Sequence, residues 1–276
     1  MLKRIGLLVF LLCLGGGAVV LYLLYNTVDI RPDYVKNGLQ QGDYEKGKLL
    51  VTAMENAYGG YEQWMSYEKA VFIQVADWYG RKSISGWDVV PQRFELAAEM
   101  GKDYGALLLV DGPNTGTRWG IDESGETYTI PRNQAKEMVD FNRYHDKYLF
   151  KNYWFQFPFR IREADFVAYA GEETIQGKTY DLVYATWGSE EANDTYDQFV
   201  LYLNQENHHL EWLYFTVRDK AAGAQLSARF DDFKYVDKMI LPHAQYIRYG
   251  KPGEEGTKVH ENHYEVIRLG SSRISR

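Results

Sequence analysis

Two pairs of histidines are the first candidates for chemistry in this chain. His208 and His209 are adjacent in a predicted turn, and His260 and His263 lie in a His-Glu-Asn-His segment with the composition of a zinc-protease motif. That motif needs both histidines on one face of a helix. Lys258–Leu269 is instead predicted to be a strand, in which these two positions point to opposite faces. The spacing therefore argues against a metal site, and solvated or packed histidines are the simpler interpretation.

Acidic residues gather between Ser189 and Asp197. Their spacing lacks the alternating oxygen ligands and central glycine of an EF-hand loop, so a solvated loop is the better interpretation. The sequence contains no Gly-x-Ser-x-Gly elbow, phosphate-binding glycine loop or Cys-His pair. We therefore expect no cofactor and no metal. A hydrolase whose acids and bases meet only in the folded chain remains an alternative.

Composition favours β-structure. Aromatic residues make up 16% of the 276 residues, and 23 of them are tyrosines, which suit broad, half-buried sheet faces. The formal net charge is -7 and no basic run is present, which argues against nucleic acid as a partner. Cys13 is the single cysteine, so an intrachain disulfide and a cysteine-ligated structural metal site are both excluded.

Short apolar and alternating segments at near-regular spacing predict an antiparallel sheet or barrel in one domain. A helix from Asp43 to Tyr58, ended by Gly59 and Gly60, precedes the first of them. The predicted strands are Ala70–Ala76, Pro91–Ala98, Ala106–Val110, Thr117–Asp122, Glu126–Ile130, Asp165–Gly171, Lys178–Trp187, Gln198–Leu203, Leu210–Val217, Gln225–Tyr235, Met239–Tyr249 and Lys258–Leu269.

The segment Pro131–Ile161 interrupts these strands. Its first part has apolar residues at helical spacing, and it ends in an aromatic run that Pro158 is expected to stop. We interpret it as a helix that closes a curved sheet and covers an apolar space. The alternative is an ordinary core helix above packed side chains.

The N-terminus predicts a membrane anchor. Lys3 and Arg4 precede an apolar run, Ile5–Tyr25, that is long enough to span a bilayer. Gly15–Ala18 could imitate a signal-peptidase site, so a cleaved signal peptide is the alternative. The positive flank predicts a cytoplasmic N-terminus and an extracytoplasmic domain. The expected division is anchor 1–30, linker 31–42, β-domain 43–269 and polar tail 270–276.

Several segments, in this order, resemble the outer-membrane lipoprotein-sorting (Lol-type carrier) proteins. They are Gly47–Gly60 followed by Trp64 and Phe72, the run Trp154–Ile161, and Gly171–Leu182 followed by Phe199–Asn204.

The resemblance implies a mainly β, α+β fold. It is an incomplete, strongly curved antiparallel β-barrel with a helical lid over an apolar cavity that holds acyl chains. The resemblance implies a ligand-binding protein and not an enzyme. The implied function is binding of lipid or lipoprotein acyl chains, in this chain from a membrane anchor on the periplasmic side. A non-catalytic structural or interaction module of the cell envelope, with a filled core and a protein partner, is the alternative. The lid residues expected to face the ligand are Met138, Phe141, Trp154, Phe155, Phe157 and Phe159.

Overall fold

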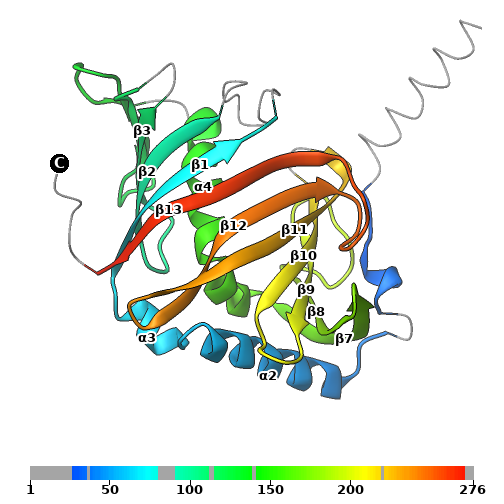
Figure 1. Cartoon of the computed structure of the whole chain (residues 1–276). Helices are drawn as coiled ribbons and strands as arrows, with labels where there is room; N and C mark the ends of the chain where they lie inside the picture. Colours follow the sequence, from blue (N-terminus) through cyan, green and yellow to red (C-terminus); the bar gives the residue numbers. More distant parts are fainter. Residues whose placement is uncertain are drawn as a thin grey trace, which may run out of the picture.

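A single antiparallel sheet of 13 strands forms most of the molecule (Figure 1). The structure is a computed structural model that describes residues 27–35, 38–79, 91–111, 115–138, 141–218 and 221–270. Its strands are β1 Lys69–Asp77, β2 Gln92–Glu99, β3 Gly105–Asp111, β4 Arg118–Ile121, β5 Thr127–Ile130, β6 Glu137–Met138, β7 Phe166–Ile175, β8 Lys178–Thr186, β9 Gln198–Asn204, β10 Leu210–Val217, β11 Ala221–Val236, β12 Met239–Tyr249 and β13 Lys258–Leu269. The helical segments are η1 Arg31–Asp33, α2 Gln41–Ala57, α3 Tyr61–Met65, α4 Phe141–Arg160 and η2 Ile161–Glu163.

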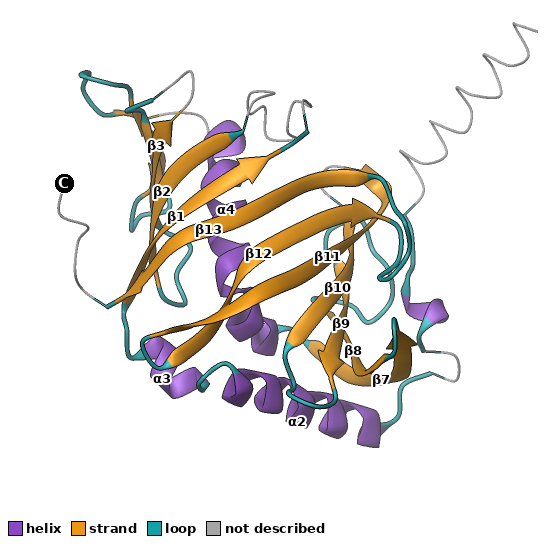
Figure 2. Cartoon of the chain, viewed as in Figure 1, coloured by secondary structure: helices purple, strands orange, loops and turns teal. Residues whose placement is uncertain are grey.

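The strand order shows why this sheet is open. It runs β6-β5-β4-β3-β2-β1-β13-β12-β11-β10-β9-β8-β7, so β6 and β7 are the two edges. The pairing of β1 with β13 joins the two halves of the chain, from Ala70 opposite Leu269 to Asp77 opposite Glu261. The predicted fold class is therefore confirmed at this level: a mainly β protein with one large, curved, unclosed antiparallel sheet and few helices (Figure 2).

The helix α4 connects the two edges of the sheet. In the chain, α4 follows β6 and leads through η2 to β7. A helix of 20 residues is about 30 Å long, enough to cross a small domain. Figure 1 shows it lying across the face around which the sheet curves. We call this the concave face; Phe72 and Phe215 lie on it.

The bounds of this helix differ from the prediction at its start. The sequence predicted helix soon after Pro131, but α4 begins at Phe141. The segment between them contains the short strand β6, in which Met138 pairs with Tyr128 and Glu137 with Thr129 of β5. A few apolar residues at mixed spacing fit a strand as well as a helix. Pairing with an exposed strand edge decided between the two.

The predicted stop at Pro158 was also wrong. Pro158 lies inside α4, which continues to Arg160 without interruption. A proline inside a helix removes one backbone hydrogen bond and costs roughly 3 kcal/mol. Its neighbours Phe157 and Phe159 are both fully buried. Burial of two phenylalanine side chains is worth about 3–6 kcal/mol, which offsets that cost.

Burial along the strands shows that the two faces of the sheet are covered differently. In β1 buried and partly exposed positions alternate, as expected when one face meets solvent. In β9 every residue is buried. The N-terminal arm, which we define as residues 27–35 and 38–40, explains this difference. It packs Ile30 and Tyr34 on the convex face of β8, β9 and β10, over Tyr184, Tyr202 and Tyr214.

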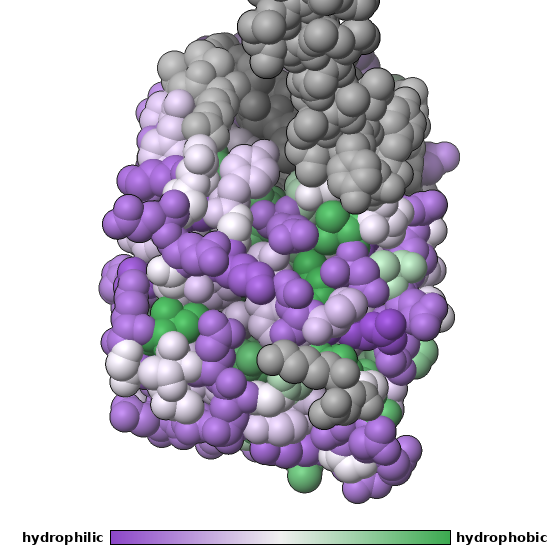
Figure 3. Space-filling model, turned by 90° about the vertical axis from the view of Figure 1, so that its right-hand side faces the viewer, coloured by the Kyte–Doolittle hydropathy of each residue, from purple (hydrophilic) through white to green (hydrophobic). Residues whose placement is uncertain are grey.

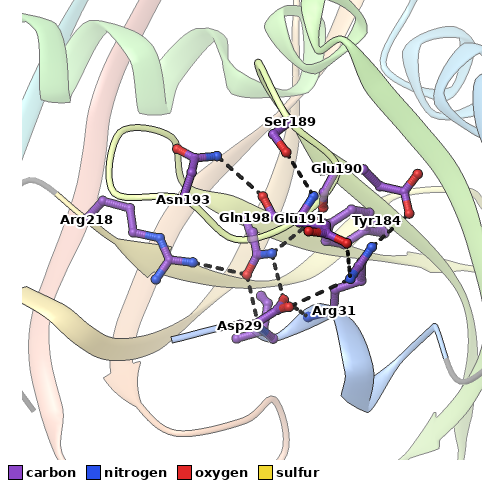
Figure 4. A network of polar contacts seen from close by, with 10 residues as sticks. Asp29, Arg31, Tyr184, Ser189, Glu190, Glu191, Asn193, Gln198 and Arg218 are labelled. Carbon is purple, nitrogen blue, oxygen red and sulfur yellow. Dashed lines mark hydrogen bonds and ion pairs between the residues drawn. The ribbon is translucent and has the colours of Figure 1, made fainter. Parts of the chain in front are cut away.

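Polar contacts hold the N-terminal arm at its upstream end (Figure 4). The Ile30 N–H donates to Gln198 Oε1 at 2.9 Å, and Gln198 Nε2 donates to Asp29 Oδ1 at 2.8 Å. Arg31 Nη1 donates to Glu190 Oε1, also at 2.9 Å, and the Tyr44 hydroxyl donates to Glu190 Oε2. The acidic loop was predicted to be solvated, yet Glu190 is one of its contacts with the arm.

Close packing places α2 beside the sheet edge. A Cβ atom at Gly47 would lie 2.6 Å from Ala168 Cα of β7, so glycine permits the approach of helix and strand. The predicted glycine stop is confirmed, because α2 ends at Ala57 and Gly59 and Gly60 follow with φ of 118° and 97°. In the part of the chain that the structure describes, no helix is long and apolar enough to cross a membrane. The predicted anchor, Ile5–Tyr25, lies outside the described residues.

The buried arm makes a prediction about where the domain begins. A chain that starts at Arg31 lacks Ile30 and Asp29, so it should be less stable than one that starts at Thr27. Burial of an isoleucine contributes about 2–3 kcal/mol, and urea unfolding of the two chains measures the difference. Ile30→Ala in the longer chain should reproduce most of the loss, whereas Asp33→Ala, at an exposed side chain, should not. Equal midpoints for the two chains would contradict this role of the arm.

Candidate functional site

Aromatic rings fill the space between the second half of α4 and the concave face. Each of the four aromatic residues predicted for this run, Trp154, Phe155, Phe157 and Phe159, is buried. A helix that is apolar on all sides belongs in a core, and these rings meet rings from α3 and from several strands. The ring-centroid distances are 4.2 Å for Phe155–Phe72, 4.4 Å for Phe159–Trp64, 4.9 Å for Trp154–Phe215, 5.3 Å for Phe157–Phe199 and 5.9 Å for Trp154–Phe157.

The structure brings together four of the six predicted lid residues. Met138 is not among them: it lies on β6 and its side chain is 52% exposed. The backbone of Phe141 begins α4, and its side chain lies outside what the structure describes. The candidate site therefore consists of the concave face and the second half of α4.

Buried amides fasten this half of α4 to the turn between β2 and β3. Gln156 Nε2 donates to the Glu99 carbonyl at 3.2 Å, and Gln156 Oε1 accepts from the Gly101 N–H at 2.8 Å. Asn152 Nδ2 donates to the Lys102 carbonyl at 2.8 Å. Sequence reasoning missed both amides, although polar residues within an aromatic run are a usable signal for such contacts.

A buried lysine lies one turn before the aromatic run. Lys151 Nζ donates to Asn262 Oδ1 at 2.9 Å, and Asn262 Nδ2 donates to Gln245 Oε1 at 3.2 Å. Burial lowers the pKa of the Lys151 amine to about 7. Nearby, the buried imidazole of His260 stacks on Trp78 at 4.1 Å, and burial and the charge of Lys151 both lower its pKa. The sequence analysis did not single out Lys151.

The predicted arrangement of the second histidine pair is confirmed. His260 is buried on the concave face, whereas His263 lies on the other face with its side chain 44% exposed. Over the described residues, no group of three or more His, Cys, Asp or Glu side chains is placed to hold a metal ion.

The outer surface offers a different kind of site. An open pocket of about 390 Å³ lies on the convex face over Trp212, Arg229 and Tyr246, and most of its lining is charged or polar. On the face shown in Figure 3, hydrophobic residues form separate islands among hydrophilic ones. The concave face, with the larger cluster of buried apolar residues, is therefore the better candidate for an apolar ligand.

Comparison with known proteins supports the fold. Neither a protein-family model nor a curated protein matches the sequence. Among solved structures, an outer membrane lipoprotein-sorting protein domain from Vibrio parahaemolyticus aligns with a TM-score of 0.55 and 12% identity, over 82% of this chain and 93% of that one. A DUF1329 family protein from Desulfovibrio piger aligns with a TM-score of 0.53 and 10% identity, over 82% and 93%. The chain thus shares with these structures the mainly β fold of one large, curved, unclosed antiparallel sheet and few helices.

The buried Lys151 amine gives this site a measurable pH dependence. Its folded pKa of about 7 lies below its ordinary value of 10.5, so between these values the unfolded chain binds more protons. Stability should therefore rise with pH, by about 2 kcal/mol from pH 7 to pH 9. Burial raises the pKa of Glu55 from 4.5 to about 7, so the protonation of Glu55 changes the stability mainly below pH 7.

Urea unfolding at pH 7, 8 and 9 tests this expectation. Lys151→Met should remove the rise, whereas Lys234→Met, at an exposed lysine, should keep it. Parallel stability curves for Lys151→Met and the unchanged chain would show that the amine is not buried as described.

Proposed function

We propose that this protein binds the acyl chains of a lipid or lipoprotein between α4 and the concave face of the sheet. One observation carries the proposal: among the described residues, the larger cluster of buried apolar side chains faces inward on an open sheet, beneath α4, α2 and α3. The lipoprotein-sorting domain from Vibrio parahaemolyticus, which has the same fold, supports this choice of ligand.

Described contacts fix the second half of α4 above the concave face. This half is tied to the β2–β3 turn by Asn152 and Gln156, and Arg160 Nη1 donates to Asp103 Oδ1. In this proposal the acyl chain lies against the rings of the second half.

We also propose that residues 1–26 anchor the protein in a membrane, with the domain on the extracytoplasmic side. The uninterrupted apolar run Ile5–Tyr25 and the preceding Lys3 and Arg4 support this. A tethered protein cannot carry a ligand across the periplasm. It would receive or present an acyl chain at the membrane that holds it, alone or with an envelope protein as partner.

A structural or interaction module is the second candidate function. It is favoured by the tight packing of the α4 rings, because Phe157 is fully buried among Tyr153, Trp154 and Phe199. In that case α4 never moves, and the concave face is simply a filled core.

Binding of a fluorescent fatty acid separates the two functions. The acyl-binding proposal expects saturable binding, which Trp154→Ala should weaken because each lost methylene contact is worth roughly 0.8 kcal/mol. Tyr235→Ala, at a side chain that is 79% exposed, is the matched control and should bind normally.

Urea unfolding of the same variants completes this test. Trp154→Ala should cost about 3–5 kcal/mol if its ring belongs to a permanently filled core. That loss, combined with no probe binding by the unchanged protein, would reject acyl binding and favour the structural module.

The anchor is tested separately on the full-length chain. Because Ile5–Tyr25 is long enough to remain in the bilayer, the protein should resist carbonate extraction from membranes and retain its N-terminal residues. A mature N-terminus near Ala18 or Val19, found by mass spectrometry, would show that a signal peptidase removes this segment.

A further inference from the structure

Three strands place an amide on the concave face where apolar side chains would otherwise be expected. Gln74 of β1, Gln245 of β12 and Asn262 of β13 are each 1–2% exposed. They are neighbours, because Gln245 pairs with Asn262 and Ala76, two residues beyond Gln74, pairs with Asn262. The same face carries aromatic rings farther along the sheet. One region of the concave face is thus polar and the rest is apolar.

A cation from α4 reaches this polar region. Lys151 Nζ lies 2.9 Å from Asn262 Oδ1 and 5.1 Å from the centre of the Phe94 ring. Phe94 pairs directly with Gln74 across β1 and β2. The ammonium group therefore lies among the amides, covered by the helix and by the sheet.

Folding stability alone does not explain why Lys151 and the three amides are buried here. Burial of an ammonium group costs several kcal/mol, and apolar residues of similar volume often replace buried charges without loss of stability. The amides are costly too: within the described part of the chain, Gln74 Oε1 accepts no hydrogen bond. Costly polar groups in an otherwise apolar site are typical of ligand recognition.

We propose that Lys151, together with the amide N–H groups of Gln245 and Asn262, binds the acidic end group of an amphiphile, a carboxylate or a phosphate attached to an acyl chain. An ammonium group and carboxamide N–H groups are donors that suit such oxygen atoms, and hydrogen bonds to charged groups are the strong ones. The hydrocarbon part lies along the aromatic rings of the concave face. This inference rests on the acyl-binding function proposed above and specifies which amphiphiles it accepts.

A pair of probes that differ only in charge tests the inference. Cis-parinaric acid and its methyl ester share one hydrocarbon chain, and fluorescence titration gives a Kd for each. The unchanged protein should bind the acid at least about tenfold more tightly than the ester. Lys151→Met should lose that preference and bind the ester within about twofold of the unchanged protein. Lys234→Met, which removes an exposed charge, should keep the preference.

The outcomes distinguish this inference from the function on which it rests. Equal binding of acid and ester by the unchanged protein would overturn the inference and leave acyl binding intact, even if Lys151→Met did not fold. No binding of either probe would overturn acyl binding and the inference together. Displacement of the acid by millimolar inorganic phosphate would identify a site for small anions and overturn the assignment to an amphiphile. Failure of phosphate to compete supports it.

Discussion

The position of the two sheet edges constrains the rest of this structure. β6 and β7 are neighbours in the chain but lie at opposite edges of a 13-stranded sheet, so the connection between them must cross a whole face. An unstructured connection would bury unpaired backbone N–H and C=O groups, and a helix pairs these groups within itself. The crossing segment is accordingly α4, and its second half is buried on nearly all sides because it is enclosed by the sheet, α3 and the β2–β3 turn.

The crossing helix also explains where polar groups are buried. Its aromatic residues interlock with the concave face, while Asn152 and Gln156 satisfy backbone groups of the β2–β3 turn. Lys151 is different, because it brings an amine into the interior. The amine donates to Asn262 of β13, and Asn262 in turn donates to Gln245 of β12. The aromatic contacts and the hydrogen bonds of Asn152 and Gln156 fix the position of the helix. In the function proposed above, the buried amine and the amides select the acidic end group of the ligand, which a purely apolar surface cannot do.

The convex face is shaped by the N-terminal arm. Without Ile30 and Tyr34, the tyrosines of β8, β9 and β10 would be exposed as a large apolar patch. The arm covers them, and the contacts of Asp29 and Arg31 with Gln198 and Glu190 fix its course. If the preceding segment is a membrane anchor, this arrangement holds the domain in a defined orientation at the membrane and not on a loose tether.

The sequence by itself determined every strand except β6, because alternation, β-branched residues and glycine turns act locally: β10 and β12 match their predicted bounds. It also determined that Trp154, Phe155, Phe157 and Phe159 belong together. It could not determine the start of α4, since the pairing of β6 with β5 is a contact between segments. Nor could it place Lys151 beside Asn262, because these residues are 111 positions apart and only the path of α4 across the sheet brings them within hydrogen-bond distance. Only the tertiary structure decides such contacts, because their energy depends on burial that no single segment possesses.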